Sequence, residues 1–288
     1  MLGIQRFMAD FALGSAIGPS LAIWRAMANR QRSSDGIGGV FHYDRFERFQ
    51  GLTNAISGTT AFPSTTVPSM DGYKAYIDSA TSASGITKRT DVEGAIVRFA
   101  PGATDNHLAI LTTGELGTIS QTAPANQPVA MEARFSFPTQ VATGSRFVGL
   151  STSGACVDGG LIADAGGLKA DQAGIGFRTK EDDADGLDII FQAASQTPVV
   201  VSDVEKVMTA GTFIKAGLLY DPEAPPAKKI KFFIDGEETD VYVTKTQLEA
   251  ATFPVDVLLG LFAASMTQAT TSTLLDLDWW AFWKGAQT

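Results

Sequence analysis

The chain is poor in the residues that most often hold metals or carry out chemistry. It has one cysteine, Cys156, and two histidines, His42 and His107. A lone cysteine forms no intrachain disulfide, which fits synthesis in a reducing compartment. Neither histidine lies in a CxxC, HExxH or related spacing, and no GxSxG motif is present. The sequence therefore predicts no metal site, no cofactor and no catalytic residue, and both histidines are interpreted as ordinary strand or turn residues.

Positive charge and long apolar runs are also scarce. The chain has 22 Lys and Arg against 31 Asp and Glu, giving a net charge of −9 and a pI near 4.7. An acidic surface does not attract phosphates or anionic lipids, so we expect neither a nucleic-acid partner nor a membrane partner. The apolar stretch 11–24 is interrupted by Gly14, Gly18 and Pro19, and it is shorter than the roughly 20 residues that span a bilayer.

Two groups of acidic residues are candidates for a catalytic or a calcium site. Glycoside hydrolases need two carboxylates across the scissile bond, and the closest match is Asp276-Leu277-Asp278, which we interpret as a solvated outer face. Residues 181–186 match the first positions of a calcium loop. However, its twelfth position is Gln192 where a bidentate Glu is needed. We interpret this cluster as a solvated turn.

The first 38 residues have a different pattern from the rest. Ile4, Phe7, Met8 and Phe11 recur at helical spacing, and a second helical pattern covers Leu21–Asn29, with Ser20 placed to cap it. Residues 32–39 are rich in Gly and Ser, which is typical of a flexible linker. We therefore divide the chain into an arm and linker, 1–38, and a second domain, 39–288.

From Val40 onward the pattern alternates with a period of two, which is typical of strands. In 129–137, Val129, Met131, Ala133, Phe135 and Phe137 share one face, and Ala130, Glu132, Arg134 and Ser136 share the other. Further strands are predicted at 94–100, 107–112, 145–151, 173–178, 187–192, 211–220, 229–235, 257–263 and 273–284, with a helical turn within 245–251. Strands without intervening helices predict an all-β fold, a two-sheet antiparallel β-sandwich.

The arm is too apolar to remain exposed to water. It carries Phe7, Met8, Phe11 and Trp24, and we predict that these residues bind a partner. The arm could dock on its own sandwich, on sister subunits or on another protein, and we favour docking on another molecule because the linker extends its reach.

The last strand supplies two more predicted partner contacts. Leu275, Leu277, Trp279, Ala281 and Trp283 alternate on what we take as the inner face, which places Trp280 and Phe282 on the outer face. Two interpretations remain open: loops or the arm cover these outer rings, or Trp280 and Phe282 contact a subunit or partner.

Several segments in order resemble a known family. They are 94–111, Phe147-Val-Gly-Leu-Ser151, Ala173-Gly-Ile-Gly-Phe177, 211–221, Lys229-Ile-Lys-Phe-Phe-Ile-Asp-Gly236 and Leu275-Asp-Leu-Asp-Trp279. This series, over roughly residues 40–284, resembles the concanavalin A-like (LamG/jelly-roll) domains of structural proteins in tailed bacteriophages. The sugar- and metal-binding acids of lectins and the catalytic acids of glucanases have no clear counterpart here.

The resemblance implies a non-enzymatic virion protein, either a head decoration or a fibre component. Its partners would be capsid or other virion proteins, and its location the virion, assembled in the host cytoplasm. A dimer or trimer is expected by the same analogy and because oligomers favour closed symmetry. The alternative function is a carbohydrate-binding, lectin-like module with a glycan partner, and a less favoured one is a glycan hydrolase.

Overall fold

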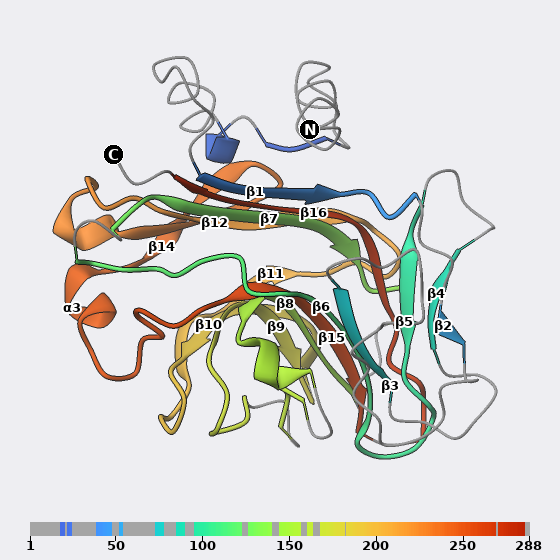
Figure 1. Ribbon diagram of the computed structural model, residues 1–288. Helices are drawn as coiled ribbons and strands as arrows, with labels where there is room; N and C mark the ends of the chain where they lie inside the picture. Colours follow the sequence, from blue (N-terminus) through green and yellow to red (C-terminus); the bar gives the residue numbers. More distant parts are fainter. Residues whose placement is uncertain are drawn as a thin grey trace.

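Two antiparallel sheets pack face to face in the computed structural model, which describes residues 18–20, 22–24, 39–47, 52–53, 73–77, 85–89, 95–122, 126–139, 144–156, 160–163, 168–181, 183–268 and 270–285. Figure 1 shows the two layers edge-on. The sandwich predicted from the sequence is confirmed. No helix among these residues is long and apolar enough to cross a membrane.

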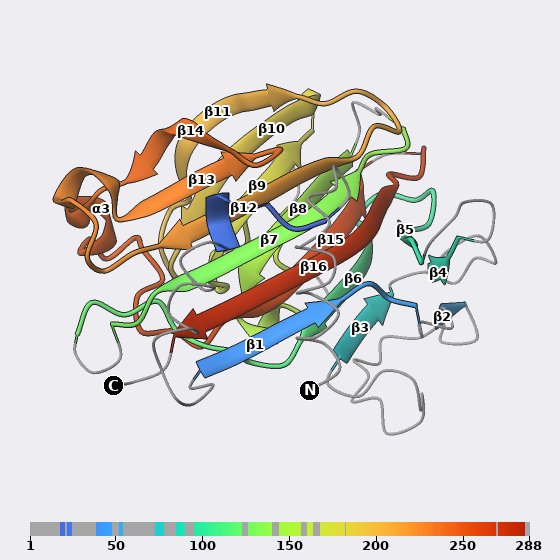
Figure 2. The same cartoon turned by 90° about the horizontal axis from the view of Figure 1, so that it is seen from above.

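Sheet A has nine strands in the order β14-β13-β12-β7-β16-β5-β4-β2, with β1 also paired to β16. Its strands are β1 Gly39–Asp44, β2 Leu52–Thr53, β4 Gly85–Lys88, β5 Val97–Ala100, β7 Val129–Ser136, β12 Ile214–Tyr220, β13 Ile230–Ile234, β14 Glu237–Val243 and β16 Leu275–Gly285. Strand β16 is central: it pairs with β7 on one side, and with β5 and then β1 on the other (Figure 2).

Sheet B has seven strands in the order β11-β10-β9-β8-β15-β6-β3. They are β3 Tyr73–Ile77, β6 His107–Thr113, β8 Gly144–Ser151, β9 Gly174–Lys180, β10 Asp183–Gln192, β11 Val199–Val207 and β15 Gly260–Thr267. Helical structure is limited to short pieces: 3-10 turns η2 Ser153–Ala155 and η4 Pro226–Lys228, helix α3 Lys245–Leu248, and the helical residues 22–24. The predicted turn within 245–251 is therefore confirmed, and Thr244 and Gln247 cap it reciprocally.

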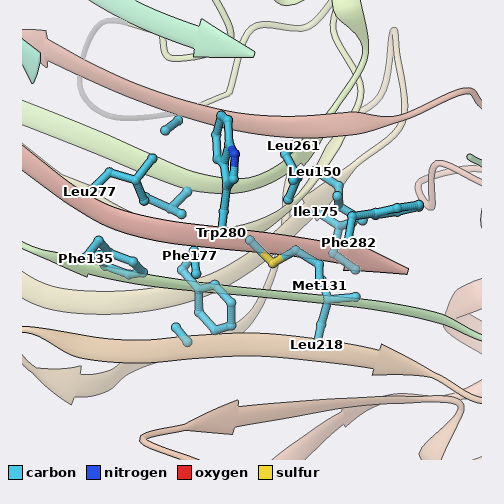
Figure 3. Close-up of a cluster of buried hydrophobic side chains, with 14 of the residues drawn as sticks. Met131, Phe135, Leu150, Ile175, Phe177, Leu218, Leu261, Leu277, Trp280 and Phe282 are labelled. Carbon is cyan, nitrogen blue, oxygen red and sulfur yellow. The ribbon is translucent and has the colours of Figure 1, made fainter. Parts of the chain in front are cut away.

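The main core lies between the sheets. Met131, Ala133 and Phe135 of β7 point into it as the alternation predicts. They meet side chains from the facing sheet, among them Leu150, Phe177 and Leu261 (Figure 3). Fully burying one such side chain stabilises the fold by about 1.5–3 kcal/mol.

Strand β16 corrects the predicted face assignment. The pairing with β7 shifts register between Leu277 and Trp279, which marks a β-bulge at Asp278. The extra residue reverses which side chains face inward from that point on. Leu275 and Leu277 lie in the main core as predicted, and so do Trp280 and Phe282, both 0% exposed (Figure 3). Trp280 and Phe282 therefore face the sandwich interior, and the outer face carries Trp279, Ala281 and Trp283.

A polar bridge closes one edge of the sandwich, between β1 in sheet A and β3 in sheet B. Tyr73 donates a hydrogen bond from its hydroxyl to Asp44 Oδ2 at 2.6 Å, and its hydroxyl lies 2.9 Å from His42 Nε2. The Tyr73 ring stacks on Trp280 at 5.9 Å between centroids. Burial lowers the pKa of His42, and Asp44 partly offsets that shift. This arrangement gives His42 a structural role in joining the two sheets.

Candidate functional site

One row of residues crosses five strands on the outer face of sheet A and has small residues near its centre. The paired registers align Phe233, Gly217, Glu132, Ala281 and Tyr43 from β13, β12, β7, β16 and β1. Glu132 therefore lies between Gly217 and Ala281, the two smallest side chains of the row, while Phe233 and Tyr43 stand further out on either side. We call this row the Glu132 site.

Part of the N-terminal segment covers this row. Residues 18–20 and 22–24, named here the docked segment, lie over the outer face of sheet A, where Figures 1 and 2 show the short helical piece above β12 and β7. Ile23 and Trp24 are 1% and 0% exposed. They join an apolar cluster with Ala130, Leu219, Phe233, Trp279, Ala281 and Trp283.

Gly217 makes the close approach of Ile23 possible. A Cβ added at position 217 would lie 2.6 Å from Ile23 Cδ1 and 2.7 Å from the Met131 carbonyl oxygen. Atoms this close would overlap, and the Met131 carbonyl belongs to the backbone and cannot move aside. Position 217 therefore needs glycine within the sheet itself, and the absence of a side chain there also lets Ile23 approach the strand closely.

One carboxylate oxygen holds the docked segment. Glu132 Oε2 accepts a hydrogen bond from the backbone N–H of Ser20 at 2.9 Å and another from Trp24 Nε1 at 2.6 Å. Trp24 N–H also donates to the Ser20 carbonyl at 3.2 Å, which closes a helical turn and brings both donors to the same side. Two donors on one buried acceptor oxygen fix the segment's position.

The charge of Glu132 is expensive to bury. Its side chain is 0% exposed, and burial raises its pKa, although the hydrogen bonds from Ser20 and Trp24 and the charge of Lys215 act in the opposite direction. Lys215 Nζ also donates to the Gly18 carbonyl at 3.2 Å. Among the described residues, Glu132 Oε1 is buried without a hydrogen-bond partner. A carboxyl group kept buried at this cost without a role in the core points to recognition.

Trp24 is the described residue among the arm residues predicted to bind a partner. It lies on its own sandwich, one of the three surfaces considered for the arm, and its binding to a partner stays a prediction. Phe7, Met8 and Phe11 lie outside the described residues. Glu132 was missed, because alternation assigned it to a polar outer face and gives no sign that a distant segment covers that face.

Asp276 and Asp278 were predicted to be solvated, and the structure corrects this. They are 0% and 4% exposed. Asp276 pairs with Arg98 and Arg89, both at 2.7 Å, and Asp278 pairs with Arg134. The predicted outer orientation of Asp276 agrees with its arginine partners, but those side chains exclude water from the carboxylate.

The outer face of sheet B has its own cover. The loop from β8 to β9 supplies Ala155, Cys156, Leu161, Ile162 and Leu168, which pack on Phe147, Ile190 and Phe262. Gln192 Nε2 holds this loop by donating to the carbonyl oxygens of Lys169 at 2.6 Å and Gln172 at 3.2 Å. Burial raises the pKa of Cys156 to about 12, so its thiol stays protonated and unreactive.

A charged group lies at the β9–β11 end of the same face. The carboxylates of Asp183, Asp188 and Asp203 come within 4.8 Å of one another. Arg178 pairs with Asp188 at 3.1 Å, and Lys180 with Asp203 at 2.8 Å. The hydrogen bond from Lys180 lowers the pKa of Asp203. Because Asp183–Gln192 is one continuous strand, the calcium-loop geometry considered from the sequence does not form there.

Comparison with known proteins supports the fold alone. No protein-family model matches the sequence, and no curated protein matches it. A protein of unknown function, SO2946 from Shewanella oneidensis MR-1, is similar in structure with a TM-score of 0.50 and 11% identity, covering 91% of this chain and 94% of that one.

Two carbohydrate-binding proteins are also similar. Peanut lectin gives a TM-score of 0.51 at 14% identity, covering 85% of this chain and 97% of the lectin. The carbohydrate recognition domain of Emp46p gives 0.50 at 13% identity, with 84% and 99% covered. The chain therefore has a concanavalin A-like jelly-roll fold, a fold that lectins share.

Proposed function

We propose that this protein is a non-catalytic structural component of a larger assembly, of the kind that decorates virion heads or forms fibres. The observation that carries the proposal is the Glu132 site: a receptor for an N-terminal segment, held by two donors on one buried carboxylate. A site that recognises a short segment outside the sheets is suited to joining protein parts. Nothing in its geometry resembles a pair of opposed carboxylates or an activated nucleophile.

The covered faces support the same proposal. Catalytic clefts and sugar sites are concave and open to their ligands. In the described residues, the outer face of sheet A carries the docked segment and much of the outer face of sheet B carries the β8–β9 loop. A sandwich covered in this way offers rigid outer surfaces for packing against neighbours in a shell or fibre.

The first test is sedimentation of the native source in a density gradient, with detection by an antibody to this chain. The expected result is co-migration with DNA-filled particles at a fixed ratio to the major shell protein. A chain that stays at the top of the gradient overturns the proposal. As a second arm, Trp24→Ala is expected to reduce incorporation severalfold, and Val200→Ala, a change at a side chain 43% exposed on β11, serves as the matched control.

The second candidate function is glycan binding, and the comparisons favour it. Two proteins of this fold are a lectin and a carbohydrate recognition domain. The charged group of sheet B offers mixed donors and acceptors, since Lys180, Asp183 and Asp203 are 31%, 25% and 64% exposed at their side chains. Sugar hydroxyls bind to such sets of carboxylates and cations.

A glycan array separates the two candidates. Binding that is lost in Asp203→Ala and kept in Trp24→Ala would support the lectin function. Particle association that is lost in Trp24→Ala and kept in Asp203→Ala would support the assembly function. Asp203 is exposed on the surface, so its replacement is not expected to affect folding.

A further inference from the structure

We propose that the docked segment of one copy of this chain occupies the Glu132 site of a second copy, so that copies are joined by exchange of their N-terminal segments. The inference rests on the proposed assembly function and names the partner of its site. It follows from how the segment is bound to the sandwich and from how it is connected to β1.

The site is specific for this segment and does not depend on which copy supplies it. Three hydrogen bonds run between segment and sandwich: Ser20 N–H and Trp24 Nε1 donate to Glu132, and Lys215 Nζ donates to the Gly18 carbonyl. The apolar contacts have the same character, since Ile23 fills the space above Gly217. An identical segment from a second copy would satisfy all of them equally.

An empty site would be unfavourable. Without the segment, Glu132 would lose both of its donors, and the apolar cluster of Leu219, Phe233, Trp279 and Trp283 would lose the packing of Ile23 and Trp24. Exposed apolar patches of this kind drive association. A segment that leaves its own sandwich therefore creates a vacant site that another copy's segment can fill.

The connection of the segment permits the exchange. Residues 25–38 join Trp24 to β1, which begins at Gly39, and such a length of chain spans up to roughly 50 Å when extended. The docked segment is not part of either sheet among the described residues. Its transfer therefore leaves the strand pairing of both sheets in place, and the contacts that it loses re-form in the partner.

The packed state of an assembly would favour exchange. In dilute solution a segment meets its own site at the effective concentration set by its connection, which is millimolar for short linkers. Neighbouring copies held side by side in a shell present their sites at comparable concentration. Exchange then links neighbours without any new contact surface.

The test uses two full-length variants that carry different tags. The first has a disabled segment, Ile23→Asp with Trp24→Ala, and an intact site. The second has a disabled site, Glu132→Ala, and an intact segment. Neither can dock its segment in its own chain, so after mixing, the second variant's segment has one good site available, on the first variant.

The expected result is that the two variants co-purify in equal amounts after mixing, while each alone is monomeric by sedimentation velocity. Absence of co-purification at concentrations where both are folded by circular dichroism overturns the inference. Adding Trp24→Ala to the second variant is the matched control and should abolish the association.

A covalent readout keeps the test decisive where a variant folds poorly. A Cβ added at Gly236 would lie 3.3 Å from Ser20 Cβ, so Ser20→Cys and Gly236→Cys would bring two sulfurs together. Because Gly236 has a φ of +88°, Gly236→Cys strains the turn, and its folding is first checked by circular dichroism. Mixed single variants should yield a disulfide-linked dimer of the two chains under oxidation. If only the double variant is cross-linked, within one chain, the segment does not exchange.

The outcomes distinguish the two proposals. If the variants fail to associate while the wild-type chain still enters particles, the exchange is wrong and the assembly function stands. If they associate while the wild-type chain never enters particles, the exchange stands and the assembly function is wrong.

Discussion

The outer faces of the two sheets are shielded from water by different kinds of segment. Each carries an apolar cluster that water would otherwise reach, and each has a cover. On sheet B the cover is the loop between β8 and β9, fixed to the sandwich at both of its ends. On sheet A it includes the docked segment, which is joined to β1 through residues 25–38. A cover inserted between two strands of one sheet must belong to its own chain, whereas a cover on a long connection can reach another molecule.

The two covers also differ in the polarity of their contacts with the sheets. The cover of sheet B meets the sheet mainly through apolar side chains, with Gln192 holding the loop backbone. The docked segment is fixed by a buried carboxylate. Apolar contacts stabilise without selecting a partner, while a buried charge makes any ill-fitting occupant costly. Substitutions in the two covers are expected to separate these two kinds of attachment.

Phe147→Ala should destabilise the whole sandwich, because the cover of sheet B unfolds together with the strands that flank it. The Phe147 ring is 0% exposed and packs edge-on against Phe262 at 6.1 Å. We expect a loss of about 3–5 kcal/mol in the free energy of unfolding, measured by chemical denaturation. A loss below about 1 kcal/mol would show that this cover is as separable as the other.

Asp188→Ala should cost slightly less, about 3 kcal/mol, because it leaves the guanidinium of Arg178 without its carboxylate partner in a site that is largely shielded from water. Denaturant midpoints again provide the measurement. Asp203→Ala, at an exposed member of the same group, is the control and should leave the denaturant midpoint nearly unchanged.

Trp24→Ala should separate local from global stability. Global unfolding is expected to change by less than about 1 kcal/mol, since the segment can leave without unfolding the strands. Amide exchange of residues 22–24 should accelerate on the order of a hundredfold, because the lost ring weakens docking alone. Hydrogen exchange read by mass spectrometry checks both. A global loss equal to that of Phe147→Ala would remove the distinction between the two covers.

Glu132→Gln should have the smallest effect, visible in the pH dependence of docking. Burial raises the pKa of Glu132 in the docked state, so docking favours the protonated carboxyl. The stabilisation is complete below the ordinary pKa and is lost as pH rises through the raised one. Protease sensitivity of the segment should therefore increase with pH in the wild type and stay flat in Glu132→Gln. Parallel profiles in the two proteins would contradict this assignment.

The strands that the sequence predicts are those in which apolar and polar residues alternate clearly. The alternation in 129–137 correctly identifies the inner face of β7, and most predicted strands have a counterpart in the structure. Strands β1, β2, β3, β4, β11 and β14 lie outside the predicted ranges. Strands β11 and β14 lie at edges of their sheets, where partly exposed side chains weaken the apolar pattern.

The candidate site was predicted only in part. Composition indicates that Trp24 must be buried, but which surface buries it depends on tertiary structure. Glu132, Gly217 and Ala281 belong to three strands far apart in sequence, and their alignment is a property of strand register. Sequence alternation separates inside from outside; it carries no information on what covers an outer face.

The bulge at Asp278 has a consequence for comparing this strand with others. It acts as a phase shift in a periodic signal, so two stretches of β16 follow the same rule half a period apart. Deleting Asp278 would restore a single phase with Trp279 still outward and Trp280 still inward, so each ring would stay in the cluster that it now serves. An alignment that allows no gap at this position would therefore match core residues of β16 with surface residues of a relative that has a regular strand.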